Sequence, residues 1–245
     1  MRIAFISDLH GNLTALEAVL ADIESMGVDQ LVCLGDAATL GPRPIEILQK
    51  LQALKCTYIM GNHDLALLEP SRAAEYEIAS HLWPDLNWCR ERLKEENFEF
   101  IRSFKMVHEI KLPNGLVVCC YHGSPRSTTD LLLATTPQED LENYLSGFSA
   151  DVYIGGHSHI QLHRRFGNKL LVNSGSVGNA FVYAYSPGVV PRLLPWAEYA
   201  IIEQNDQSLN VNLRRINYDT QRLLEEVRKS ELPGSAWWFN QFKDG

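Results

Sequence analysis

The sequence predicts an α/β fold in which parallel strands alternate with helices. Short apolar runs at residues 3–7, 31–34 and 56–60 have the length and composition of buried strands. Between them, apolar residues recur at helical spacing over residues 14–26 and in a second segment that opens at Pro44. Because a strand–helix–strand order joins parallel strands through right-handed crossovers, this part of the chain is expected to form a parallel sheet covered by helices.

The ends of the first helix have recognisable signals. Thr14 and Glu17 have the spacing of a capping box, which predicts a helix start at about Thr14. Asn12 is a second candidate for the cap. Gly27 suits the position just after the helix, where a left-handed backbone is common.

The rest of the chain changes from helices to hairpins. Residues 65–104 have a mostly helical pattern, interrupted at Pro70 and Pro84. Asn-Gly and Gly-Asn pairs then separate strand-like runs and predict hairpins. The predicted strands of this half are residues 106–112, 116–121, 151–154, 162–166, 169–172, 197–203 and 209–216.

The C-terminal part is predicted to hold a helix over residues 218–230 and an aromatic tail at 236–239 that packs on the body or on a neighbour. No Pro-, Gly- or Ser-rich linker divides the chain. We therefore expect one domain over residues 1–245, with a helical excursion at about residues 65–104.

The overall composition limits the possible partners and compartments. A net charge of −8 and a pI of about 5.5 give no basic surface for duplex nucleic acid or an anionic membrane, so neither is an expected partner. The five cysteines are odd in number and form no CxxC pair, as expected of reduced thiols. The N-terminus turns polar too early for a signal peptide, and no stretch approaches the ~20 apolar residues of a membrane span. A cytoplasmic protein is expected.

Metal-ligating side chains follow nearly all of the strands that should meet at one edge. Ligands gather at the carboxyl ends of parallel strands, and this chain places two aspartates, one asparagine and four histidines after such runs, with His63 in addition. These candidate ligands are Asp8, His10, Asp36, Asn62, His122, His157 and His159. Imidazoles and carboxylates without thiolates suit first-row divalent metals. Seven ligands are too many for one tetrahedral ion, so two metals are predicted.

The order of these motifs resembles the calcineurin-like metallophosphoesterase superfamily. Asp-x-His, Gly-Asp, Gly-Asn-His-Asp, His-Gly and Gly-His-Ser-His occur in that order from Asp8 to His159. Each motif alone is weak, but the complete ordered series is specific. The resemblance implies a four-layer α/β/β/α sandwich, in which two mixed sheets lie face to face and are flanked by helices.

The resemblance also implies a role for each candidate ligand. By position, Asp8, His10 and His159 hold a first metal, and Asp36 bridges it to a second one. The second set consists of Asn62, His122 and His157. The expected ions are manganese or iron, and zinc or nickel also suit these ligands.

The resemblance implies hydrolysis of a phosphoester. In this reading a hydroxide held between the metals attacks phosphorus in line, and the metals neutralise the phosphate oxygens. His63 is next to a ligand without being one, so it is expected to protonate the leaving oxygen as a general acid or to stabilise the transition state.

Two positions depart from the protein-phosphatase branch of the superfamily. That branch continues Gly-Asp into Gly-Asp-x-x-Asp-Arg, whereas Thr39 and Leu40 stand in the last two places here. The missing Arg removes a bidentate phosphate clamp, and the missing Asp removes the usual partner of the catalytic histidine. Asp64 and Thr39 are the remaining candidates to orient His63.

These departures favour the small prokaryotic-type branch, which often acts on phosphodiesters or nucleotides. Residues 40–44, 122–126 and 173–178 also resemble that branch. We expect a phosphodiesterase with a small substrate such as a nucleotide. The alternatives are a phosphomonoesterase, including a phosphoprotein phosphatase, and a scaffold that has kept the fold without the chemistry. The sequence predicts no oligomeric state.

Several polar and aromatic residues have both a structural and a functional interpretation. Asp64 could simply cap a helix, and Asn12 could contact a metal-bound water, although capping is favoured for Asn12. Three arginines could bind phosphate, but such residues more often form a solvated face. They are Arg126, Arg164 and Arg165. The aromatic residues at alternate positions 181, 183 and 185 could stack on a base or form one face of a strand. Three other histidines are expected at the surface or in the core, namely His81, His108 and His163.

Overall fold

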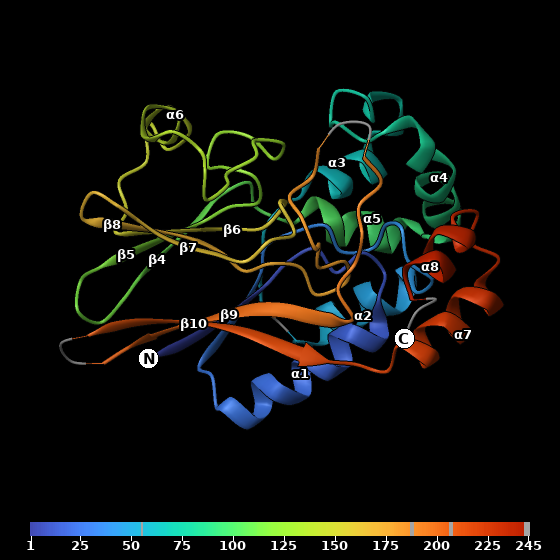
Figure 1. The fold of residues 1–245 in the computed structure, drawn as a ribbon, viewed down its shortest axis with the longest axis horizontal. Coiled ribbons are helices and arrows are strands. Elements are labelled where there is room, and N and C mark those ends of the chain that lie inside the picture. The colour runs from blue at the N-terminus through green and yellow to red at the C-terminus, as the bar shows by residue number, and fades with distance from the viewer. Residues whose placement is uncertain (55, 187–188, 206–207, 243–245) are drawn as a thin grey trace.

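The computed structural model describes residues 1–54, 56–186, 189–205 and 208–242. They form two five-stranded sheets (Figure 1). The first sheet has the order β10-β9-β1-β2-β3, and the second has the order β4-β5-β6-β8-β7. The strands of the first sheet are β1 (Arg2–Ile6), β2 (Gln30–Cys33), β3 (Thr57–Tyr58), β9 (Trp196–Gln204) and β10 (Leu209–Asn217). Those of the second are β4 (His108–Lys111), β5 (Val117–Cys120), β6 (Val152–Gly155), β7 (Leu162–Phe166) and β8 (Lys169–Asn173).

Both sheets are mixed, as expected. In the first, β1, β2 and β3 are parallel, whereas β9 is antiparallel to β1 and to β10. In the second, β5, β6 and β8 are parallel, and β4 and β7 are antiparallel edge strands. The two hairpins predicted by the Asn-Gly and Gly-Asn pairs are the β4–β5 and β7–β8 pairs.

Most of the helices share one hydrophobic core with the outer face of the first sheet, on which the first helix packs directly. They are α1 (Leu13–Met26), α2 (Pro44–Leu54), α3 (Asn62–Leu68), α4 (Trp83–Arg92), α5 (Glu95–Arg102), α7 (Thr220–Ser230) and α8 (Ser235–Gln241). Only a thin layer covers the second sheet, where α6 (Gln138–Tyr144) and its flanking loops pack on β5 and β6. Figure 1 shows α6 far from α4, α7 and α8. The α/β/β/α arrangement is confirmed, with one thick and one thin helical layer.

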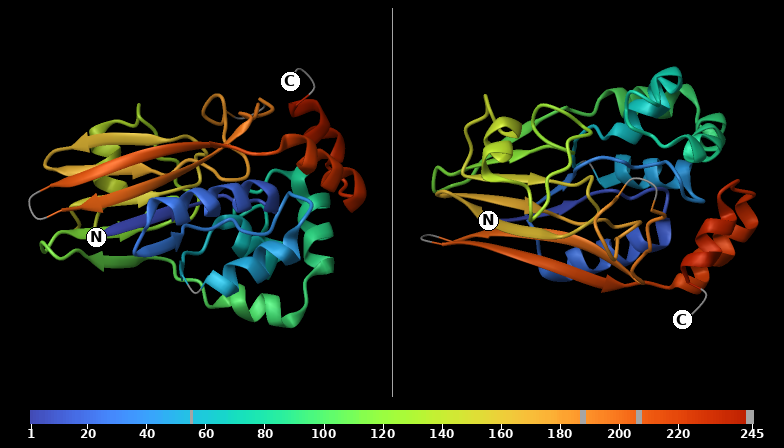
Figure 2. Two further views of the ribbon diagram at one scale, coloured as in Figure 1. Left: turned by 90° about the horizontal axis from the view of Figure 1, so that it is seen from below. Right: turned by 45° about the horizontal axis from the view of Figure 1, so that its top comes forward.

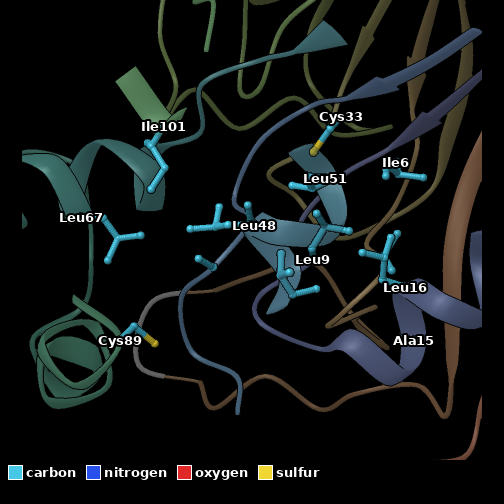
Figure 3. Close-up of a cluster of buried hydrophobic side chains, with 14 of the residues drawn as sticks. Ile6, Leu9, Ala15, Leu16, Cys33, Leu48, Leu51, Leu67, Cys89 and Ile101 are labelled. Carbon is cyan, nitrogen blue, oxygen red and sulfur yellow. The ribbon is translucent and has the colours of Figure 1, made fainter. Parts of the chain in front are cut away.

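Strand β1 is apolar from Ile3 to Ile6 because both of its faces are buried. Along β1, Ile3 and Phe5 join the core between the sheets, whereas Ala4 and Ile6 face the helices. This follows from the two-residue period of a strand. On the helical side, Ile6 packs in a cluster with residues such as Leu16 of α1 and Leu48 of α2 (Figure 3). Full burial of each such side chain stabilises the fold by about 1.5–3 kcal/mol.

The first helix begins differently from the prediction. Asn12 is its N-cap, because the Asn12 side-chain oxygen accepts a hydrogen bond from the Ala15 N–H at 3.0 Å. The Thr14–Glu17 capping box is therefore wrong. Thr14 lies within the first turn and its hydroxyl donates to Glu226. Gly27 has the expected left-handed conformation, with φ of 60°.

The middle and the end of the chain are helical in the expected places. Residues 65–104 hold most of α3, then α4 and α5, with two 3-10 turns at Pro70–Arg72 and Ser80–Leu82. Figure 2 shows α7 and α8 at the end of the molecule opposite the N-terminus. The aromatic tail packs on the body, since Trp238 of α8 is only 1% exposed. No helix in the described ranges combines the length and apolarity that crossing a membrane requires.

Candidate metal centre

The candidate ligands converge because they follow parallel strands from both sheets. Asp8 and His10 come after β1, Asp36 after β2, Asn62 after β3, His122 after β5, and His157 and His159 after β6. Among their side chains, one group that could hold a metal ion consists of Asp8, His10 and His159, and another consists of Asp36, His122 and His157. Within each group the ligand atoms lie within 4.8 Å of one another. A third group, formed by His10, Asp36 and His63, lies between them.

The ligand atoms point at one another. His10 Nε2 lies 3.1 Å from His159 Nε2, which itself lies 3.2 Å from Asp8 Oδ1. In the second group, His122 Nε2 lies 3.3 Å from Asp36 Oδ2 and 3.1 Å from Asn62 Oδ1. The Asn62 amide nitrogen donates to the Tyr76 carbonyl at 2.9 Å, which turns the amide oxygen toward the centre.

Backbone acceptors fix the ring tautomer of two histidines. His122 Nδ1 donates to the Leu34 carbonyl and His159 Nδ1 donates to the Asn179 carbonyl, both at 2.7 Å. The proton on Nδ1 leaves a lone pair on Nε2, which is the form that binds metals. The contact between His159 Nε2 and Asp8 Oδ1 is then not a hydrogen bond. Consistent with this, buried Asp8 Oδ1 has no hydrogen-bond partner among the described residues.

The charges at the centre also fit a cation. Burial raises the pKa of Asp36, but nearby His122 and His63 outweigh it and hold that pKa well below its usual range. Burial lowers the pKa of His122, yet the carboxylates of Asp36 and Asp8 outweigh burial and raise it to about 10. Burial with neighbouring imidazoles lowers the pKa of His10 to about 3 and that of His157 to about 4. Ionised carboxylates and neutral imidazoles are the forms that ligate divalent ions. Asp36, His10 and His157 already have these forms, whereas an ion must displace the second ring proton of His122.

The backbone is strained where it presents these ligands. Five of them have a left-handed backbone, which costs a non-glycine residue about 1–2 kcal/mol. They are Asp8 (φ 53°), His10 (φ 44°), Asp36 (φ 55°), His157 (φ 65°) and His159 (φ 56°). Hydrogen bonds between the loops hold this conformation, for example from Asp8 N to Gly35 O at 2.9 Å and from His10 N to Asp36 O at 3.0 Å. Strain concentrated in this way is typical of functional sites.

Two glycines next to the ligands leave room for carboxylates. A Cβ at Gly61 would lie 2.5 Å from the Asp36 backbone nitrogen and 2.8 Å from Asp36 Cγ. A Cβ at Gly156 would lie 2.6 Å from Asp8 Oδ2. Real Cβ contacts essentially never fall below 3.0 Å, so the Gly-Asn-His-Asp and Gly-His-Ser-His motifs require glycine for close packing.

Asp64 caps α3 and also holds the Asp36 loop. Its carboxylate accepts hydrogen bonds from the backbone N–H groups of Gly61 at 3.0 Å, Asp36 at 2.8 Å and Ala37 at 3.0 Å. Burial and the charge of Asp36 raise the pKa of Asp64 to about 6. All three donors are backbone N–H groups, so Asp64 holds the Asp36 loop rather than the ring of His63.

His63 reaches the centre through its backbone as well as its ring. The His63 N–H donates to Asp36 Oδ1 at 2.9 Å. Its buried ring Nδ1 has no hydrogen-bond partner within the described part of the chain. The ring packs edge-on against His10, with centroids 5.1 Å apart. Thr39 contacts His10 instead of His63, with 3.5 Å between Thr39 Oγ1 and His10 Nδ1.

The arginines noted in the sequence have structural partners or are exposed. Arg126 pairs with Asp130 at 2.8 Å, and Arg164 donates to the carbonyls of Ala134 and Thr136. Arg165 is exposed on β7.

The aromatic residues after Asn179 divide between the site and the surface. The Phe181 ring packs on His159 with centroids 4.3 Å apart. Tyr183 and Tyr185 are exposed. Sequence reasoning missed the packing role of Phe181 and both carbonyl acceptors, because a backbone oxygen leaves no signal in the residue type.

The geometry is a two-sheet α/β sandwich with acidic and imidazole side chains at the strand ends, where they could hold metal ions. A family model described as the calcineurin-like phosphoesterase superfamily domain matches residues 1–189. The chain belongs to this superfamily. Membership supports a metal-dependent phosphoesterase activity.

Similar proteins match this chain over nearly its whole length. An uncharacterized protein of Methanocaldococcus jannaschii is 30% identical over 238 residues, which cover 94% of this chain and 93% of the relative. The crystal structure of a metallophosphoesterase from Sphaerobacter thermophilus is 25% identical, has a TM-score of 0.72 and covers 98% of both chains. A hypothetical protein from Pyrococcus horikoshii OT3 is 20% identical with a TM-score of 0.80, covers 97% of this chain and 96% of its own, and shows the shared fold.

Proposed function

We propose that the protein is a dinuclear metal-dependent phosphodiesterase that hydrolyses a nucleotide or another small phosphodiester. The observation that carries this proposal is the position of Asp36. Its carboxylate belongs to the group with His122 and His157 and also to the group with His10 and His63, so it lies close to His10 of the first proposed donor set. One carboxylate shared by two donor sets is the arrangement that holds two cations close together.

Each remaining ligand has a place around this carboxylate. Asp8, His10 and His159 would hold the first ion, and Asn62, His122 and His157 the second. Both aspartates are ionised, whereas Asn62 contributes a neutral oxygen, so two divalent ions would leave the centre with net positive charge for a phosphate. When bound, the ions would supply a nucleophile from water and neutralise the phosphate oxygens.

His63 is the proposed general acid. Its ring lies within reach of both His10 and Asp36, and its backbone N–H is tied to the bridging carboxylate. It can therefore donate a proton to a leaving oxygen on the phosphate that faces the ions. The ring is positioned by its packing against His10 and by its location in the first turn of α3, rather than by a carboxylate partner.

The charge of the site favours a diester over a monoester. A monoester carries a dianionic phosphoryl group and gains more from an additional cation. Leu40 occupies the position where a protein phosphatase has an arginine, and Arg126 and Arg164 already have partners. A diester carries one negative charge and needs no such clamp.

The remaining parts of the proposal follow the sequence. The two proposed ions are divalent manganese or iron, and zinc or nickel also suits the ligands. The chain is proposed to work as a single domain in the cytoplasm, on a small phosphoester, without binding duplex nucleic acid or a membrane. The net charge of −8 supports the last point.

Hydrolysis of bis(p-nitrophenyl) phosphate by the manganese-loaded protein tests the proposal. We expect activity in the wild type, loss of activity in Asp36→Asn, and a lower kcat/KM for p-nitrophenyl phosphate. A preference for the monoester would overturn the diester assignment. Two bound ions without hydrolysis of either ester would favour the scaffold.

A further inference from the structure

The two ring nitrogens of His10 face different environments. His10 Nε2 points to the candidate metal position, 3.1 Å from His159 Nε2. On the opposite side of the ring, Nδ1 lies 3.5 Å from Thr39 Oγ1. Both residues are fully buried, with 0% exposure. Among the described residues, the Thr39 hydroxyl is therefore the partner placed to accept a proton from His10 Nδ1.

This partner differs in kind from those of two other candidate ligands. His122 and His159 donate to backbone carbonyls. A carbonyl can only accept, so it fixes the proton on Nδ1. A hydroxyl can accept or donate, so Thr39 permits either tautomer of His10 until an ion occupies Nε2. The partner of His10 is also a side chain, which a mutation can remove.

The loop that carries Thr39 is held on three sides. The Ala37 N–H donates to Asp64 Oδ1 at 3.0 Å, and the Ala37 carbonyl accepts the Gly11 N–H at 2.9 Å. On the other side of Thr39, the Leu40 carbonyl accepts the indole N–H of Trp238 at 2.9 Å. The hydroxyl is thus placed by contacts from α3, from the β1–α1 loop and from α8.

We propose that Thr39 is a positioning residue for the first metal ion: its hydroxyl accepts the Nδ1 proton of His10 and so orients the ring with the Nε2 lone pair toward the ion. This inference rests on the proposed dinuclear centre. At the position where the protein-phosphatase branch has the aspartate that orients the catalytic histidine, this chain has a residue that acts on a metal ligand.

Two variants of Thr39 separate the hydroxyl from the packing. Thr39→Val removes the acceptor and keeps the shape of the side chain, whereas Thr39→Ser keeps the acceptor. The loss of a hydrogen-bond partner of a metal-ligating histidine typically weakens metal binding by about 10–100-fold. We expect this loss for the first ion in Thr39→Val and wild-type binding in Thr39→Ser.

The readout is a zinc titration followed by long-range ¹H–¹⁵N correlation of the histidine rings. His10 and His159 report on the first ion, and His122 and His157 on the second. In the wild type, zinc should fix the proton of His10 on Nδ1. In Thr39→Val that proton should exchange faster, and the first ion should bind more weakly while the signals of His122 are unchanged.

Three results would overturn the inference, and they differ in meaning. Equal zinc affinity at the first site in wild type and Thr39→Val would reject the role of Thr39 alone. Equal weakening in Thr39→Val and Thr39→Ser would assign the effect to packing. If zinc leaves the His10 signals of the wild type unchanged, the proposed metal centre itself fails.

Discussion

Substitution of Gly61 by alanine tests the idea that this glycine exists to make room for the Asp36 carboxylate. Gly61 has φ of −92° and ψ of 169°, which any residue can adopt. Alanine therefore adds no backbone strain, and it lowers the entropy of the unfolded chain, which is worth about 0.4–1 kcal/mol in its favour. Any loss of stability must come from the new methyl group.

The size of that loss follows from the contact between the new methyl group and the Asp36 loop. The added Cβ would lie 2.5 Å from Asp36 N, and an ordinary contact begins at 3.4 Å. The two loops must separate by the difference, about 0.9 Å. Overpacking of this kind costs about 1–3 kcal/mol. The hydrogen bonds from His63 N to Asp36 Oδ1 and from Asp36 N to Asp64 Oδ2 lengthen at the same time, and each charged bond is worth about 1.5–3 kcal/mol.

We expect the free energy of unfolding of the metal-free Gly61→Ala protein to fall by about 2–5 kcal/mol in urea, after allowance for the entropy gain. Metal binding should weaken too, because the Asp36 carboxylate, the proposed bridging ligand, is displaced. Gly115→Ala is the matched control. Its φ is +88° and nothing lies within 4 Å of the added Cβ, so it should lose only about 1–2 kcal/mol through backbone strain and bind metal normally. A Gly61→Ala protein that loses less than Gly115→Ala and binds two ions as the wild type does would refute the reasoning.

Three further predictions concern the proposed acid, the ligands and the C-terminal helix. His63→Ala should lower kcat for bis(p-nitrophenyl) phosphate by about 10²–10⁴-fold while two ions remain bound by elemental analysis; loss of the ions would instead make His63 a ligand. The pKa of His122 is raised to about 10 in the metal-free protein, so the protonated ring stabilises the fold fully below pH 6.5, and this stabilisation is lost as the pH rises through 10. Metal affinity should increase by about tenfold per pH unit between these values, because the ion displaces one proton from the ring. Calorimetry in buffers of different ionisation enthalpy would show no proton release on metal binding if this were wrong. Trp238→Phe should cost about 1–2 kcal/mol in urea, because it removes the indole N–H from the Leu40 carbonyl, and an unchanged unfolding midpoint would contradict the proposed support of that loop by α8.

The sequence predicted the fold well where the signals were local. The apolar run at residues 3–7 became β1 because both faces of that strand are buried, and the Asn114-Gly115 pair became the turn between β4 and β5. The start of α1 was predicted less well. Both Thr14 and Asn12 can cap a helix by residue type. In the structure Asn12 is the cap, whereas the Thr14 hydroxyl donates to Glu226, which lies 212 residues away in the sequence.

The sequence by itself determined which residues could form the centre, since carboxylates, imidazoles and glycines at strand ends are readable from residue type and from the two-residue period of strands. The tertiary structure alone decided how they are held. The Leu34 carbonyl lies 88 residues from the ring of His122 that it fixes, and Asp64 reaches back 28 residues to the Asp36 backbone. Likewise, Thr39 contacts His10, although the motif pattern made it a candidate partner of His63. The physical reason is that hydrogen-bond partners are chosen by which loops the two sheets bring together, and that depends on the packing of the whole chain.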